Sequence, residues 1–304
     1  MELSQWIREW TARAGERFRE GEPMRLHTSF KIGGPADFWL SPASAEEIAS
    51  ARREAQALGL PVMVLGNGSN LLVSDLGIEG LVIQIGEDFA GITVEGDTII
   101  AQSGARLSRV CLAAQAAGLS GLEFAYGIPG NVGGAVTMDA GAYGGEVGQR
   151  ITRIRVLNGE GEILTVPAEN MRFAYRHSRV MEEDWIVLDA AFRLEAGDPA
   201  AIRETMEDIS ARRRDKQPLN FPSAGSVFKR PEGYFAGKLI EDAGLKGASV
   251  GDAQVSEKHA GFIVNKGHAT CRDVEALIEQ IQKTVRERFG VELEPELRRI
   301  GRNA

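Results

Sequence analysis

The clearest helical pattern of hydrophobic and polar positions lies in residues 271–290. Apolar side chains recur there every three or four positions, at Val274, Leu277, Ile278, Ile281, Val285 and Phe289. Gly290 follows the last of them directly. This spacing predicts a long amphipathic helix that ends at the glycine.

Three further segments also predict helices. Ser44 and Glu47 have the spacing of a capping box, and a helical period follows them as far as Gly59. Residues 106–118 form the second predicted helix and end in glycine. Asp198 precedes a proline and a long basic segment, so it is expected to cap the third.

Short apolar runs between glycine turns predict strands. They lie at residues 60–65, 80–85, 92–101, 151–167 and 185–194, and the run 92–101 predicts a hairpin around its glycine. Helices and strands mixed in this way indicate an α+β fold. We expect a boundary near residue 200, where strand-rich glycine turns give way to basic helices and loops.

Composition narrows the class of protein. The 304 residues carry a net charge of −8, which argues against nucleic acid as a partner. No apolar run approaches the roughly 18 residues of a membrane span, and the charged N-terminus does not resemble a secretory signal. Cys111 and Cys271 match no metal-ligand spacing. We expect them to be core thiols of a cytoplasmic protein that holds no metal.

Local positive charge stands out against this acidic background. Residues 211–217 hold four cations, Lys229 and Arg230 follow, and a last cluster begins with Arg298. Each cluster alone is most often a solvated face. Two clusters near the C-terminal third make a small anionic ligand worth considering, because lysine and arginine bind phosphate and carboxylate.

Two glycine-rich stretches follow predicted strands. Residues 65–70 read LGNGSN, and residues 127–148 hold eight glycines. The dinucleotide fingerprint fails in the first, because its third glycine is missing and no helix follows. Either stretch could be an ordinary cluster of turns. Together they indicate a ligand-binding wall of backbone amides.

The stretch 222–231, PSAGSVFKRP, places Ser226 directly after a glycine and close to two cations. A lone Gly-Ser pair is usually a surface turn. Seven motifs in order change that reading: HTSFKIGGPAD, VLGNGSNLLVSD, GIPGNVGGAV, AGAYGGE, YRHSR, PSAGSVFKRP and LEPELRRIG. In this order the chain resembles the UDP-N-acetylenolpyruvoylglucosamine reductases, from about residue 25 to residue 301.

The resemblance implies an FAD-binding half of the vanillyl-alcohol-oxidase type, followed by a smaller α+β substrate domain. We expect the first at residues 1–200, as two α+β subdomains split near residues 85–90, and the second at residues 201–304. The implied enzyme uses NADPH and FAD to reduce the enolpyruvyl ether of UDP-N-acetylglucosamine enolpyruvate to UDP-N-acetylmuramate. That reaction belongs to peptidoglycan precursor synthesis in the cytoplasm, and hence to cell-wall biogenesis, cell shape and cell division. We expect a monomer without membrane or nucleic-acid partners.

The resemblance also implies roles for individual residues. Ser226 would donate a proton to the substrate, Arg176 would steady its carboxylate, and Glu296 would complete the catalytic site. FAD would bind through Gly66, Asn67, Gly68, Ser69, Asn70, Gly127, Ile128, Pro129, Gly130, Gly133, Gly134 and Ala135. The first of these turns holds no histidine or cysteine, so we expect non-covalent binding. The diphosphate would bind Lys216, Lys229 and Arg298.

The chain departs from the family pattern at several positions. Asp139 stands where asparagine is expected, and Arg230 replaces the asparagine of a longer branch of the family. That branch closes its site with a tyrosine, and none lies between Arg176 and Ser226. His177 could be an acid or a structural residue, and Tyr143 and Tyr175 could stack on a ligand or pack in the core.

Two other functions stay open at this point. One is a flavin oxidase on the same FAD scaffold, which has no reason to carry the segments around Ser226 and Glu296. The other is a non-catalytic binder of nucleotide sugars, which would need only the basic clusters.

Overall fold

The computed structural model describes residues 2–303. Its helices are α1 (Leu3–Ala14), α2 (Ala45–Ala57), α3 (Leu107–Ala116), α4 (Val132–Thr137), α5 (Pro199–Lys216), α6 (Ala236–Asp242) and α7 (Cys271–Phe289). Its strands are β1 (Phe18–Pro23), β2 (Pro35–Leu40), β3 (Val62–Leu65), β4 (Leu71–Val73), β5 (Ile78–Gln84), β6 (Ile92–Glu95), β7 (Thr98–Gln102), β8 (Leu119–Ser120), β9 (Gly141–Ala142), β10 (Gly145–Glu146), β11 (Ile151–Leu157), β12 (Ile163–Pro167), β13 (Ile186–Arg193), β14 (Glu195–Ala196), β15 (Ser249–Val250), β16 (Ala253–Val255), β17 (Ile263–Asn265) and β18 (Arg298–Ile300).

The four predicted helices are confirmed as α2, α3, α5 and α7. α7 has a full capping box of Thr270 and Asp273, and Gly290 ends it in the left-handed region. At α2, Ser44 accepts from Glu47 N at 3.2 Å, but the Glu47 carboxylate accepts from Ala43 N instead of closing the box. Helix caps of this kind can be predicted from the sequence because each involves residues within four positions of one another.

The chain divides into two compact units that differ from the expected ranges 1–200 and 201–304. The first unit holds residues 1–19, 39–67 and 81–213, and the second holds residues 20–38, 68–80 and 214–304. The second unit therefore takes two segments from the N-terminal part of the chain. Strand β4 explains one of them, because it pairs in parallel with β18, and Leu71 lies opposite Arg298. No local pattern signals a partner more than two hundred residues away.

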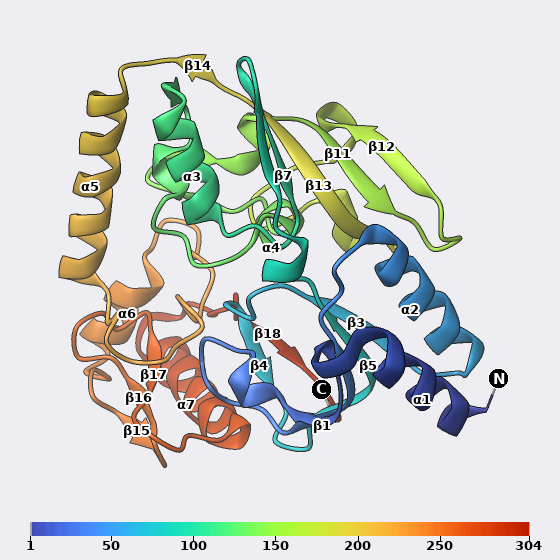
Figure 1. Ribbon diagram of the computed structural model, residues 1–304. Helices are drawn as coiled ribbons and strands as arrows, with labels where there is room; N and C mark the ends of the chain where they lie inside the picture. The colour runs from blue at the N-terminus through green and yellow to red at the C-terminus, as the bar shows by residue number, and fades with distance from the viewer. Residues whose placement is uncertain (1, 304) are drawn as a thin grey trace. The chain divides into compact units, whose positions relative to one another are not determined.

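The first unit is built on an antiparallel sheet of strand order β12-β11-β13-β7-β6 (Figure 1). All but the last residue of β13 is buried, so both faces of this central strand are covered. Val110 of α3, Val136 of α4 and Ile202 of α5 belong to the same hydrophobic core as the sheet. α4 lies close to β13, and it places the glycine-rich loop before it at the edge of this core.

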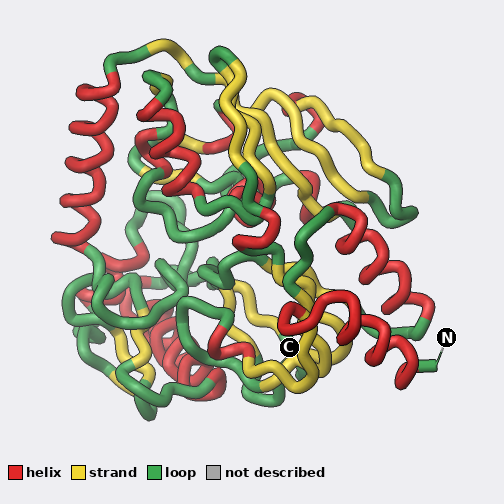
Figure 2. Tube along the Cα trace, viewed as in Figure 1, coloured by secondary structure: helices red, strands yellow, loops and turns green. Residues whose placement is uncertain are grey.

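The second unit has a smaller sheet of strand order β15-β16-β17. α7 packs along this sheet, as the tube in Figure 2 shows, and the helix contributes Val274, Leu277 and Ile281 to the core. The apolar positions whose spacing predicted α7 therefore form the face of the helix that the unit buries. Among residues 2–303, no helix has the length and apolar character needed to cross a membrane.

Candidate active site

The two predicted cofactor loops meet within the first unit. A Cβ atom on Gly66 would lie 3.5 Å from the Cβ atom of Asn131, so the turn after β3 contacts the loop before α4. Within residues 2–303 the backbone N–H groups of Gly66, Asn67, Gly127 and Gly130 donate no hydrogen bond. These amides are therefore available to a ligand.

Two buried polar side-chain atoms beside these loops also lack a hydrogen-bond partner within residues 2–303. Asn131 donates from Nδ2 to Ile85 O at 3.0 Å, but its Oδ1 atom accepts nothing from residues 2–303. The hydroxyl of Ser103 is unpartnered too, and a Cβ atom on Gly133 would lie 3.0 Å from the Cβ atom of Ser103. Unsatisfied buried polar atoms are costly, so these two atoms favour a bound polar group. The sequence reasoning missed both side chains, although the asparagine stands inside the GIPGNVGG motif.

The second half of the first glycine turn belongs to the second unit. Gly68 has a φ of 60°, and a Cβ atom there would overlap the carbonyl oxygen of His27, so the position requires glycine. Asn70 donates from Nδ2 to Glu296 O at 3.2 Å, and Asn70 O accepts from Arg298 N at 2.9 Å. The structure thus joins a predicted cofactor residue to a predicted catalytic segment.

Ser226 and Glu296 lie on neighbouring stretches of backbone. Glu296 N donates to Val227 O at 2.7 Å, and Val227 N donates to Gly261 O at 2.9 Å. The Ser226 side chain is exposed, while Glu296 is half-buried. Two predicted catalytic residues that are 70 positions apart in the chain are therefore brought together in one unit.

The predicted diphosphate ligands differ in their surroundings. The side-chain ammonium of Lys229 pairs with the carboxylate of Glu294. The backbone N–H of Lys229 donates to the backbone oxygen of Glu294 at 2.9 Å. Lys216 is the last residue of α5 and is exposed, and Arg298 is exposed on β18. Lys229 is therefore already neutralised, whereas Lys216 and Arg298 form no ion pair within residues 2–303.

Arg176 belongs to the first unit and stands at the tip of a tight turn. Ala174 and His177 close this turn with two backbone hydrogen bonds of 3.1 and 2.8 Å. Arg176 has a φ of 56°, and its Cζ atom lies 4.9 Å from the centroid of the Tyr175 ring. A non-glycine residue in the left-handed region is uncommon and is often found at functional sites.

The His177 ring contacts a carboxylate. Its Nε2 atom lies 2.7 Å from Glu182 Oε1, and Arg172 pairs with the same carboxylate. The hydrogen bond from His177 lowers the pKa of Glu182, with help from Arg172. This arrangement favours the structural reading of the histidine over the reading as an acid.

Asp139 keeps the acceptor that an asparagine would supply. It is 2% exposed, and its Oδ1 atom accepts from Gly148 N at 2.8 Å. Burial raises the pKa of Asp139, and the positive charge of Arg176 acts against that shift. The aspartate therefore preserves the loop contact while it places a carboxyl group within the field of Arg176.

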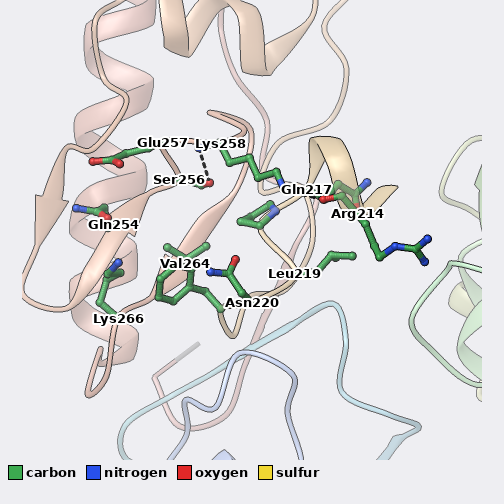
Figure 3. A pocket seen from close by; sticks show the side chains of 12 residues that line it. Arg214, Gln217, Leu219, Asn220, Gln254, Ser256, Glu257, Lys258, Val264 and Lys266 are labelled. Carbon is green, nitrogen blue, oxygen red and sulfur yellow. Dashed lines mark hydrogen bonds between the residues drawn. The ribbon is translucent and has the colours of Figure 1, made fainter. Parts of the chain in front are cut away.

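A polar pocket of about 470 Å³ lies in the second unit, and sequence reasoning did not find it (Figure 3). Its lining is Arg214, Gln217, Pro218, Leu219, Asn220, Phe221, Gln254, Ser256, Glu257, Lys258, Val264 and Lys266. Lys266 Nζ lies 3.9 Å from the centroid of the Phe221 ring, and Lys258 Nζ donates to Arg214 O at 2.6 Å. Neither lysine forms an ion pair within residues 2–303.

The pocket combines three kinds of group. Cations can hold an anion, the amides of Gln217, Asn220 and Gln254 can pair with polar ring edges, and apolar side chains can pack against a ring. This composition suits a nucleotide. In the part of the chain that the structure describes, no group of three His, Cys, Asp or Glu residues could hold a metal ion.

Comparison with known proteins gives matches across both units. The family model of the UDP-N-acetylenolpyruvoylglucosamine reductase C-terminal domain matches residues 217–300, and an FAD binding domain model matches residues 36–167. The chain is 51% identical over 280 residues to the UDP-N-acetylenolpyruvoylglucosamine reductase of Caldanaerobacter subterraneus subsp. tengcongensis, covering 92% of each chain. It is 52% identical over 294 residues to the enzyme of that name from Agathobacter rectalis, covering 93% of each.

One solved structure agrees with these relatives. The crystal structure of UDP-N-acetylenolpyruvylglucosamine reductase from Thermus caldophilus superposes with a TM-score of 0.81 at 35% identity. The match covers 93% of this chain and 99% of that one.

Proposed function

Because the chain belongs to the UDP-N-acetylenolpyruvoylglucosamine reductase family, we propose that it is the FAD-dependent oxidoreductase that forms UDP-N-acetylmuramate for peptidoglycan. The observation that carries this proposal is about 50% identity to such reductases over more than nine-tenths of both chains. A flavin oxidase is disfavoured, because the reductase C-terminal domain matches residues 217–300.

The groups of the first unit fit FAD as a non-covalent cofactor. Gly66, Asn67, Gly127 and Gly130 would hold it through their free N–H groups, and Asn131 Oδ1 offers an unused acceptor. Backbone donors of this kind suit phosphate and flavin oxygens. When bound, FAD takes up a hydride from NADPH and supplies it to the enolpyruvyl group.

The roles of the protein's own residues follow from the charge that the reaction creates. Hydride addition to the terminal vinyl carbon places negative charge on the enol carboxylate. Arg176 would stabilise that charge, because a positioned cation interacts more strongly with the charge as it develops. The exposed hydroxyl of Ser226 would donate the proton to the adjacent carbon. Glu296 would complete the site beside the serine, where its backbone N–H donates to Val227 O.

The UDP part of the substrate has two sets of candidate ligands in the second unit. Lys216 and Arg298 are exposed cations that suit the diphosphate, and Lys229 could take part only by leaving Glu294. We assign the nucleoside end to the pocket of Figure 3, whose amides and apolar side chains suit a pyrimidine ring.

The proposal is tested by following the flavin through both halves of the reaction. The purified protein should be yellow, NADPH should bleach it without oxygen, and the enolpyruvyl UDP-sugar should restore the colour. Acid denaturation should release all the flavin into solution. A colourless protein that ignores flavin would support the non-catalytic binder instead. A bleached flavin that oxygen restores and the enolpyruvyl substrate does not would support an oxidase.

A further inference from the structure

Arg213 lies against the first residue of the glycine-rich loop. A Cβ atom on Gly127 would overlap the Cδ atom of Arg213 and would lie 2.9 Å from its Nε atom. The arginine side chain is half-buried, and it belongs to the same compact unit as the loop. The guanidinium therefore stands beside Gly127, whose N–H group donates no hydrogen bond within residues 2–303, although the sequence neighbours of Arg213 form a basic surface cluster.

No group within residues 2–303 neutralises this guanidinium. Arg213 forms no ion pair and donates no hydrogen bond there, whereas the neighbouring Arg212 pairs with Asp208 at 2.7 Å. Burial lowers the pKa of Arg213, and the phenol of Tyr143 acts in the opposite direction. A half-buried cation has lost part of its hydration without gaining a partner, and a bound anion would restore the balance.

The surroundings indicate the source of that anion. Gly127 and Gly130 present unused N–H donors in the same loop, and Asn131 and Ser103 have unpartnered polar atoms. Gly127, Gly130 and Asn131 are assigned above to FAD. FAD carries negative charge on its diphosphate at all times, and on its ring system after reduction.

We infer that Arg213 binds an anionic group of FAD at the Gly127 loop. This inference rests on the proposed function, since it assumes that the two glycine-rich loops hold FAD. It assigns to cofactor binding one cation of the basic cluster at residues 211–217. It also accounts for the glycine at position 127, because any larger residue there would displace the arginine side chain.

The test compares three variants of the apoprotein. Arg213→Gln removes the charge and keeps most of the aliphatic stem, Arg213→Lys keeps a charge, and Arg212→Gln removes the neighbouring cation that is already paired. Each is titrated with FAD and with riboflavin by flavin fluorescence, and the reduction potential of the bound flavin is measured. Arg213→Gln should weaken FAD binding by about tenfold to a hundredfold, the range for one charge-assisted hydrogen bond. Arg213→Lys should recover part of this loss, and Arg212→Gln should bind FAD like the wild type.

The pattern across ligands identifies the anionic group. If Arg213 contacts the diphosphate, Arg213→Gln should bind FAD more weakly and riboflavin as the wild type does. If Arg213 contacts the ring, Arg213→Gln should have a lower reduction potential, because the reduced flavin has lost its counter-charge. If folded Arg213→Gln matches the wild type in FAD affinity and in potential, the inference is wrong and the proposed function stands. A wild-type apoprotein that binds no flavin would overturn both. Arg213→Met replaces the glutamine variant if circular dichroism shows that the latter does not fold.

Discussion

Ser226 is held by the backbone around it and not by its own side chain. Its hydroxyl forms no hydrogen bond within residues 2–303. Val227, by contrast, is bonded on both sides, to Gly261 and to Glu296. Removal of the hydroxyl should therefore leave the fold unchanged, which makes this position suitable for a chemical test.

Ser226→Ala should separate the two half-reactions. Transfer of hydride from NADPH to FAD needs no proton on the substrate carbon, so bleaching should proceed at the normal rate. Reoxidation by the enolpyruvyl substrate should slow by about 10²–10⁴-fold, the contribution of a positioned acid. Ser226→Cys should retain part of the activity, because a thiol can also deliver a proton. Stopped-flow absorbance of the flavin measures both halves. Loss of both halves equally, or of neither, would remove the proton-donor role.

The effect of replacing each candidate diphosphate ligand should depend on whether that cation is already paired with a carboxylate. Lys216→Ala should weaken binding of the UDP-sugar by about 1.5–3 kcal/mol, and Lys229→Ala should weaken it as well if the lysine leaves Glu294 for the ligand. Glu294→Ala then should not weaken binding, because it frees the lysine. Lys238→Ala serves as the control, since that lysine is paired with Asp242 on α6. Titration calorimetry measures the affinity of each variant for the UDP-sugar. If Lys216→Ala and Lys229→Ala both bind it as the wild type does, the basic clusters are solvated surface and do not bind the diphosphate.

At the scale of elements, the segment after β4 also serves as a cap. The Asp75 carboxylate accepts from Cys271 N at 2.8 Å and from Arg272 N at 3.2 Å, at the beginning of α7. Thr270 accepts from Asp273 N at the same helix end. The aspartate that closes the VLGNGSNLLVSD motif therefore stabilises a helix about 200 residues later in the chain.

Asp75→Ala should lower the free energy of unfolding by about 1–2 kcal/mol, because two N–H groups at the start of α7 lose their acceptor. Urea denaturation followed by circular dichroism measures the loss. The control is Asp242→Ala, which removes only an exposed i,i+4 pair on α6 and should change stability by less than about 0.5 kcal/mol. Equal effects of the two substitutions would contradict the cap.

Substitutions in the pocket between β16, β17 and the loop after α5 should weaken substrate binding and leave flavin reduction unchanged. Lys266→Ala removes a cation that no carboxylate neutralises within residues 2–303, so the KM for the UDP-sugar should rise about tenfold. Bleaching by NADPH should stay normal. Lys246→Ala is the matched control, because that lysine pairs with Glu241 on the surface of the same unit. A KM that is equal in both variants would remove the nucleotide from this pocket.

At the scale of the whole molecule, each compact unit has a core with one buried thiol. Cys111 belongs to the core of the first unit and Cys271 to that of the second. Burial raises the pKa of each thiol to about 12. The two cysteines therefore report separately on the integrity of the two units.

Neither thiol should react with a disulfide reagent in the native protein at pH 8. With a pKa of about 12, the thiolate fraction at that pH is about 10⁻⁴ and the sulfur is covered. In the denatured protein both thiols should react, and absorbance should show two equivalents of the reagent's chromophore released per chain. Cys111→Ser and Cys271→Ser each assign one of them. Rapid reaction of a native thiol would show that its unit opens under these conditions.

The raised pKa of the buried thiols predicts lower stability at alkaline pH. Between about pH 9 and pH 12 the unfolded chain loses the thiol proton, while the folded chain keeps it. The unfolded state then binds fewer protons, so the free energy of unfolding falls as the pH rises, by at most ~1.4 kcal/mol per pH unit for each thiol. Urea denaturation of the wild type and of Cys111→Ala across this range measures the slope. The alanine variant should lose the part of the slope that Cys111 contributes.

Features that depend on near neighbours can be read from the amino-acid sequence. The period of α7 and its end at Gly290 involve residues within one or two turns, so the chain records them directly. The ordered motifs likewise determined the family and the candidate roles of Ser226 and Glu296, because each motif is a short run whose identity needs no fold.

Contacts between distant residues, by contrast, become visible only in the folded chain. Asn70 contacts the Glu296 segment, Lys229 is neutralised by Glu294, and Arg213 stands unpaired beside Gly127 while the adjacent Arg212 is paired. A basic run in the sequence cannot distinguish these cases, because every member carries the same charge. The packing of distant segments sets which charges are paired and which are left for a ligand, and that packing depends on contacts between residues far apart in the chain.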